Sequence, residues 1–219
     1  MRRRAGLGMV ASAVVAVALL VGCTPSAAPG PSSSPTAKES TAAPAPSATA
    51  DGPASPSPTA SVALRGPLTL PSCPDLLPMS VVQTQFGPNA VALDVWSTAS
   101  EVMAGPAAAD AVSAAVSSEI CAWGIPNSDG GFHVVAAELT PAAATSLISS
   151  LRTAGTFTEQ DTGARISFTR DLENEIGSYA VTYIFDQTAW VTAVGALTPA
   201  GIRPIGDAAM DAVVAANRD

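Results

Sequence analysis

The sequence predicts an α+β fold, with a single domain over residues 65–219 built on a mostly antiparallel sheet, helices packed on one face and one disulfide. Two pairs of strand-like segments are each separated by a short turn, which predicts hairpins. Helix-like segments are scattered among the strands without a regular strand–helix–strand alternation, and this favours antiparallel pairing. A disordered stalk rich in proline, serine, threonine and alanine is expected to precede the domain.

The domain is expected to begin with a helix, a strand and a second helix. Residues 74–86 predict a helix, because proline and aspartate suit its first turn and Gly87-Pro88 would stop it. Residues 91–96 follow as a candidate strand. Residues 106–116 are rich in alanine and predict the second helix.

The first hairpin is expected in the middle of the chain. Its strands are residues 119–125 and 132–139, and the residues between them, 126–131, have a turn composition of Pro, Asn, Ser, Asp and Gly. A helix should follow, since Thr140 precedes a proline in the manner of an N-cap and Gly155 suits the helix end.

The last third of the domain predicts more strands and a final helix. Residues 165–170 alternate between polar and apolar side chains, as a strand with one wet face does. Residues 179–185 and 189–196 are rich in aromatic and β-branched side chains and form the strongest hairpin pattern. Residues 206–216 predict the closing helix.

The N-terminus has the pattern of an export signal. Three arginines precede 17 uncharged residues, Ala5 to Val21, a length at or below the minimum for a spanning helix. An uncleaved anchor helix is the alternative. The apolar stretch ends in Leu20-Val21-Gly22-Cys23, which resembles the lipobox of bacterial lipoproteins.

That resemblance implies the fate of the N-terminus. Residues 1–22 would be removed as a signal peptide, and Cys23 would carry a diacylglyceryl group on its sulfur, with further acylation of the new amino terminus. The protein would then be held at the extracytoplasmic face of the cell membrane by two or three acyl chains, where one alone binds marginally. Residues 23–64 would be the lipidated N-terminus and stalk, because their composition offers too little apolar surface to fold.

The cysteine count agrees with export. With Cys23 assigned to lipid, Cys73 and Cys121 form an even pair, and in an oxidising compartment this predicts a disulfide. Two buried free thiols are the alternative. Trp123 lies two residues after Cys121, so on a strand both side chains share a face, and an aromatic beside a disulfide is expected in the core.

A second resemblance concerns these cysteines. Cys73-Pro74-Asp75-Leu76-Leu77-Pro78 followed by Cys121-Ala122-Trp123 resembles small lipoprotein ectodomains of high-GC Gram-positive bacteria. The resemblance implies an extracytoplasmic α+β domain with one disulfide, and it implies no activity.

The charge excludes one class of partner. All 18 acidic residues and only seven basic ones follow Cys23, so that part of the chain has a formal charge near −11. Such a surface repels nucleic acid, and we expect no nucleic-acid binding.

Residues with catalytic or metal-binding potential are few. His133, the single histidine, is expected on a strand surface, because no nucleophile or orienting carboxylate is identifiable for it. The run Asp171, Glu173 and Glu175 could supply calcium ligands, but the glycine and glutamate of a calcium loop are missing, so a solvated loop is preferred. We therefore expect no catalytic residue, no metal site and no cofactor.

These observations favour a non-enzymatic ligand-binding or sensing domain displayed on a stalk. The alternative is an assembly or structural accessory of the cell envelope, and a cell-wall hydrolase comes third. Besides the membrane itself, the expected partner is a cell-wall component or a membrane protein.

Overall fold

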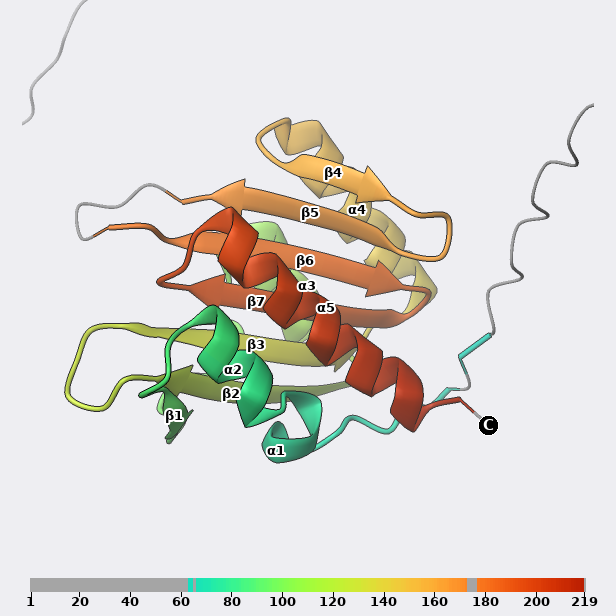
Figure 1. Cartoon of the computed structure of the whole chain (residues 1–219). Helices are drawn as coiled ribbons and strands as arrows, with labels where there is room; N and C mark the ends of the chain where they lie inside the picture. Colours follow the sequence, from blue (N-terminus) through green and yellow to red (C-terminus); the bar gives the residue numbers. More distant parts are fainter. Residues whose placement is uncertain (1–62, 65, 173–176, 219) are drawn as a thin grey trace, which may run out of the picture. The chain divides into compact units, whose positions relative to one another are not determined.

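A seven-stranded antiparallel sheet forms the centre of the part of the chain that the structure describes (Figure 1). The computed structural model describes residues 63–64, 66–172 and 177–218, all within one compact unit. The predicted signal peptide, Cys23 and nearly all of the predicted stalk lie outside the described residues.

The strand order across the sheet is β1-β2-β3-β7-β6-β5-β4. Along the chain the strands are β1 (Val91–Leu93), β2 (Ser117–Gly124), β3 (Gly131–Glu138), β4 (Thr158–Asp161), β5 (Ile166–Asp171), β6 (Ala180–Asp186) and β7 (Ala189–Gly195). Both predicted hairpins, β2–β3 and β6–β7, are confirmed. After β3 the chain crosses to the far edge at β4 and returns strand by strand until β7 pairs with β3.

Five helices cover the sheet in the described residues, and none of them is long and apolar enough to cross a membrane. They are α1 (Cys73–Leu76), α2 (Met79–Gln85), α3 (Pro106–Ser113), α4 (Pro141–Ala154) and α5 (Pro199–Ala216). The predicted ends of α4 are confirmed. The Thr140 side chain accepts a hydrogen bond from Ala143 N at 3.2 Å, and Gly155 ends the helix in the left-handed region at φ 63°.

The helices lie on both faces of the sheet, and the expectation that they pack on one face is wrong. In Figure 1, α1, α2 and α5 cross the near face while α3 and α4 lie behind. The reason is the composition of the central strands: every residue of β6 and β7 is buried. Because successive side chains of a strand point to opposite faces, apolar residues on both faces require cover on both.

The near face is covered mainly by α5. Val134 and Ala136 of β3 pack there with Ile205 and Met210 of the helix. Gly206 allows the close approach, because a Cβ at that position would lie 2.7 Å from Thr182 Cγ2. The α5 helix can therefore pack tightly against β6.

The far face has an aromatic core beneath α3 and α4. The rings of Phe185 and Trp190 stack with centroids 6.2 Å apart, and Tyr183 lies 6.1 Å from Trp190. Leu147 and Leu151 of α4 pack onto this layer. Such aromatic pairs add to the burial of apolar area that holds the helices to the sheet.

The predicted disulfide is confirmed: Cys73 at the start of α1 is bonded to Cys121 of β2, with Cα atoms 5.5 Å apart. The expectation for Trp123 is confirmed as well. Its side chain is 2% exposed and its ring stacks on Phe132 at 5.6 Å. The bond thereby fastens the N-terminal helices to β2, the strand next to the edge strand β1.

Several elements differ from the sequence expectation. The expected strand over residues 91–96 is shorter, ending at Leu93, and the helix expected over residues 106–116 ends at Ser113. Residues 74–86 form two short helices because the chain is extended at Leu77 and Pro78. The helix expected from residue 206 begins at Pro199, where the Thr198 side chain accepts a hydrogen bond from Gly201 N at 3.2 Å. Strand β4 was not predicted, since its residues are polar and exposed.

Candidate functional site

A cavity of about 280 Å³ lies between the start of α3, the end of α4 and the sheet. Its walls are largely apolar, from the alanines of α3 and from Leu151, Ala154 and Phe157. Two polar side chains of the sheet also line it, Arg170 of β5 and Tyr183 of β6. An apolar cavity with a few convergent polar groups is the usual form of a small-molecule site.

Arg170 is the charged group of this cavity. Its guanidinium carbon lies 5.7 Å from the centre of the Phe157 ring, and its Nη1 donates to Thr156 Oγ1 at 3.3 Å. No carboxylate of the described residues forms a salt bridge with it. In a domain with an excess of acidic residues, an arginine held by a ring and a hydroxyl keeps its charge available for an anion.

The other arginines near the sheet are already paired with carboxylates. Arg152 binds Glu159 at 2.6 Å, and Arg165 binds Asp186 at 3.3 Å and Asp211 at 2.7 Å. Arg203 lies 3.6 Å from Asp207 within α5. Arg170 therefore differs from these arginines in its surroundings as well as in its place beside a cavity.

Tyr183 contributes a hydroxyl that stays protonated. Burial raises the pKa of Tyr183 to about 12, while a hydrogen bond from the backbone of Ala104 and the charge of Arg170 act in the opposite direction. At neutral pH the phenol is thus a neutral donor. The cavity presents a cation and a hydroxyl donor over an apolar wall.

The start of α3 adds partial positive charge to the same cavity. Gly105 precedes the helix and has no side chain to cap it, so the first backbone N–H groups have no capping partner from that residue. Gly105, Pro106 and Ala107 all line the cavity. The partial positive charge of these N–H groups would attract an anion in the cavity, as the positive charge of Arg170 does.

One buried polar atom on the strand next to Tyr183 has no hydrogen-bond partner among the described residues. Thr192 of β7 is the cross-strand neighbour of Tyr183, and its Oγ1 is buried without a hydrogen bond among the described residues. A buried hydroxyl in that state costs free energy. Thr192 is not among the residues that line the cavity, so its hydroxyl is not counted among the groups that could contact a ligand there.

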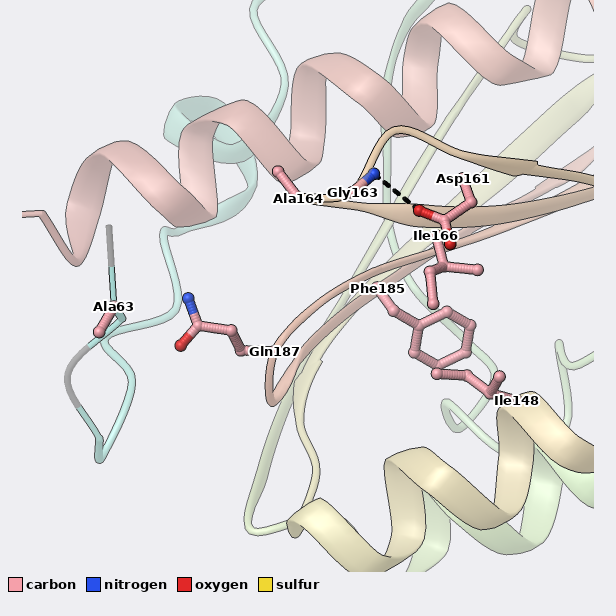
Figure 2. Close-up of a pocket in the computed structure, with 8 residues that line it drawn as sticks. All are labelled: Ala63, Ile148, Asp161, Gly163, Ala164, Ile166, Phe185 and Gln187. Atoms are coloured by element: carbon pink, nitrogen blue, oxygen red, sulfur yellow. Dashed lines mark hydrogen bonds between the residues drawn. The ribbon is translucent and has the colours of Figure 1, made fainter. Parts of the chain in front are cut away.

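A larger cavity of about 450 Å³ lies at the ends of the hairpins (Figure 2). Ile148, Ile166 and Phe185 form its apolar side. The carboxylate that lines this cavity, that of Asp161, is already bonded within the turn, because its Oδ1 accepts a hydrogen bond from Gly163 N at 2.7 Å. Among the described residues that line it there is no basic side chain, so it offers less to hold a ligand in one orientation.

A third cavity, of about 410 Å³, follows the outer strands beside α5. Thr158, Gln160 and Thr169 give it a polar wall, and Arg170 and Arg203 border it. None of the described residues that line it is aromatic, and Arg203 is paired with Asp207. We regard the cavity between α3 and α4 as the candidate site.

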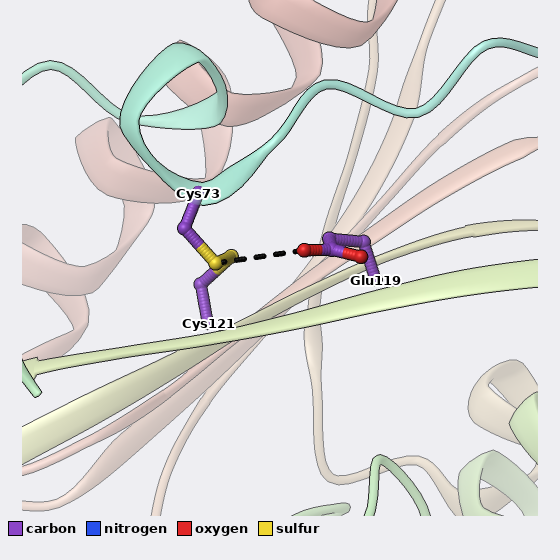
Figure 3. Close-up of side chains that lie close together, drawn as sticks. All are labelled: Cys73, Glu119 and Cys121. Carbon is purple, nitrogen blue, oxygen red and sulfur yellow. Dashed lines mark hydrogen bonds between the residues drawn. A yellow bond between two sulfur atoms is a disulfide. The ribbon is translucent and has the colours of Figure 1, made fainter. Parts of the chain in front are cut away.

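The disulfide has a carboxylate beside it. Figure 3 shows Glu119 next to Cys73 and Cys121, and its Oε1 approaches Cys73 Sγ at 3.6 Å. The two sulfur atoms and a carboxylate oxygen of Glu119 lie within 4.8 Å of one another, a spacing at which three ligand atoms could hold a metal ion. In the oxidised protein both sulfurs are bonded to each other, so neither is a thiolate and Cys73 has no proton to donate.

The residues singled out from the sequence do not gather at one site. His133 lies on β3 as expected, but it is half-buried, and burial lowers the pKa of its imidazole. No hydrogen bond joins its imidazole to the side chain or backbone of another described residue. Asp171 ends β5 and is exposed, while Glu173 and Glu175 lie outside the described residues.

One carboxyl group has the raised pKa that acid catalysis would need. Burial raises the pKa of Asp207, Arg203 and Arg165 lower it, and Asp211 raises it again. Asp207 already contacts Arg203 of α5, and Asp211 contacts Arg165 from the turn before β5. Neither carboxyl group lines any of the cavities above. The pair therefore lacks a place for a sugar or peptide bond between its members.

Sequence reasoning missed Arg170 and Tyr183. The sequence contained a signal for Arg170. Ile166, Phe168 and Arg170 are spaced two residues apart and so share one face of β5, which places an arginine beside apolar core residues. Tyr183 looked like an ordinary strand residue, and its position opposite α3 depends on the crossover that brings that helix over the sheet.

Comparison with known proteins does not assign this site. No protein-family model matches the chain, and no curated protein matches it.

Proposed function

We propose that this protein is a membrane-anchored lipoprotein whose extracytoplasmic domain binds a small organic anion without chemical conversion. The observation that carries the proposal is Arg170, a guanidinium without a carboxylate partner among the described residues, beside an apolar cavity. The cell-surface part of the proposal rests on the Leu20-Val21-Gly22-Cys23 ending of the apolar N-terminal segment.

The ligand class follows from the lining. A carboxylate would accept hydrogen bonds from Arg170, and its apolar portion would lie against Phe157 and Leu151. A volume of about 280 Å³ limits the ligand to a small acid. Tyr183 would favour ligands with a hydrogen-bond acceptor near its hydroxyl, since this hydroxyl remains a donor at neutral pH.

Binding without catalysis is the simpler role for these groups. A hydrolase would need a nucleophile or an acid–base pair at the ligand, and the side chains of this cavity that can form hydrogen bonds are Arg170, Tyr183 and Ser150. Ser150 Oγ donates to Ser146 O at 3.0 Å within α4, and none of the described residues that line the cavity is a carboxylate or histidine that could act as its general base.

The test is calorimetric titration of benzoate into the chain from residue 23 onward, with Cys23→Ser to keep it free of lipid. Arg170→Gln should weaken binding roughly 10- to 100-fold, because a hydrogen bond to a charged group contributes about 1.5–3 kcal/mol. Arg218→Gln is the matched control, since Arg218 is exposed at the C-terminus and its loss changes the charge equally. Benzamide, a neutral analogue of the same shape, should bind less tightly than benzoate.

Two results would contradict the proposal. One is that Arg170→Gln and Arg218→Gln weaken benzoate binding equally, which would show that only the net charge of the protein matters. The other is the absence of benzoate and hexanoate binding at millimolar concentrations, together with turnover of an ester or glycan substrate by the same preparation.

A further inference from the structure

The β1 edge of the sheet, which we define as residues 91–96, is unusual in its exposure. Val91 and Leu93 are exposed, and Trp96 is 91% exposed. Strand β1 pairs with β2 on one side, and no other described strand pairs with its outer side. Its outer backbone N–H and C=O groups are therefore available for a further strand.

Proteins ordinarily protect such an edge with lysine, proline or a covering segment. The β1 edge has none of these side chains. Its one charged residue is Asp94, which is exposed and forms no salt bridge in the described structure. The apolar side chains stand on an edge that nothing described covers.

The part of the sequence that contains the β1 edge has only one sign of formal charge. Between Gly66 and Leu151 the sequence has no lysine or arginine. The acidic residues of this stretch are Asp75, Asp94, Glu101, Asp110, Glu119, Asp129 and Glu138, and none of them forms a salt bridge with a described residue. Hydrogen bonds from the backbone and side chain of Thr98 lower the pKa of Glu101, so this carboxylate, which follows Trp96 in the sequence, is ionised at neutral pH.

We infer that the β1 edge binds an extended, basic segment of another protein, which adds to the sheet as a strand beside β1. The backbone groups of β1 would supply the pairing. Lysine or arginine of the partner would lie near Asp94 and Glu101, and one of them over the face of Trp96. This inference is independent of the anion-binding cavity, which lies between α3 and α4.

Charge excludes the two occupants that the chain itself could supply. A second copy would bring two acidic edges together, and like charges at a strand pair are unfavourable. The residues between Cys23 and Leu64 contain a single basic side chain, Lys38. They also contain recurring prolines, which lack the N–H that a ladder needs. A basic segment of a different protein could supply both the opposite charge and the backbone N–H groups that strand pairing needs.

The experiment is a titration followed by NMR, with the isotope-labelled chain from residue 23 onward and Cys23→Ser. The probe is a ten-residue peptide in which lysine alternates with valine, and the comparison peptide has glutamate in place of lysine. We expect the lysine peptide to shift the amide signals of residues 91–96, and we expect its affinity to fall as salt is raised. The glutamate peptide should leave these signals unchanged.

Variants separate edge pairing from general attraction to an acidic protein. Ala92→Lys puts a protecting charge on the exposed edge and should weaken binding at least about tenfold. Ala142→Lys adds the same charge at an exposed position of α4 and should weaken it less than about twofold. Trp96→Ala should weaken binding about threefold or more.

Several results would overturn the inference. Equal effects of Ala92→Lys and Ala142→Lys would show that net charge alone attracts the peptide. Shifts confined to other strands, or no shift at millimolar peptide, would show that the β1 edge is not a docking site. A dimer in sedimentation experiments that Ala92→Lys dissociates would identify the occupant as a second copy.

Discussion

The disulfide is expected to provide a large share of the domain's stability. Cys73 and Cys121 are 48 residues apart in sequence. In the chain-entropy model, closing a loop of that length in the unfolded chain stabilises the folded state by about 4 kcal/mol. Since domains of this size are stable by about 5–15 kcal/mol, reduction should remove a substantial fraction of the free energy of unfolding.

The measurement is urea unfolding of the Cys23→Ser chain, with and without a phosphine reductant. With an m value of about 2 kcal/mol per molar urea, the midpoint should fall by about 2 M on reduction. A double variant with alanine at both positions is the control, because its midpoint should not respond to the reductant.

A fall of less than about 0.5 M in the midpoint, with mass analysis showing complete reduction, would refute this reasoning. It would mean that the contacts of α1 and α2 with α5 hold the N-terminal helices in place without the covalent bond. Packing without the covalent bond is the competing explanation because Leu76 and Leu77 are buried in the same core as Cys121. The size of the fall in the urea midpoint therefore separates the contribution of the disulfide from that of the packing.

Four further predictions concern other parts of the chain. Gly206→Ala should lower the free energy of unfolding by about 1–3 kcal/mol through overpacking against β6, whereas Gly201→Ala in the same helix should cost less, as thermal unfolding will show. Benzoate affinity should be constant between pH 6 and 9, because the pKa of Tyr183 is raised to about 12 and arginine does not titrate there; a loss of affinity centred in that range would implicate another group. Limited proteolysis should leave a resistant fragment that begins near residue 65, and a protected fragment containing residues 30–60 would contradict the predicted stalk. Mass analysis of the membrane-extracted protein should find a lipidated Cys23 at the N-terminus, and an intact Met1 or an unmodified Cys23 would exclude the lipoprotein assignment.

The sequence predicted elements whose signals are local. Thr140-Pro141 and Gly155 marked the ends of α4, and the composition of residues 126–131 marked the turn between β2 and β3. These features work because capping and turn formation depend on a few neighbouring residues. The cysteine pair was predicted from its number and its compartment, and its geometry agrees.

Other features depend on contacts between distant segments. Strand β4 is exposed and polar, and it is a strand because β5 offers it a partner, with Thr158 opposite Thr169. The start of α5 was obscured by Pro204 inside the helix, a residue that usually ends one. The cavity beside Arg170 could not be predicted for the same reason, since it exists only where α3 and α4 meet the sheet.

The most direct test of the binding proposal is a map of where benzoate acts on the protein. In a titration followed by amide chemical shifts, the proposal predicts the largest changes at residues 104–108 and at Arg170, with saturation that Arg170→Gln moves to roughly 10- to 100-fold higher benzoate concentration. Changes centred on residues 161–166, at the larger cavity of the hairpin ends, would contradict the assignment of the site. Uniform small changes without saturation would contradict the existence of a specific anion site in this domain.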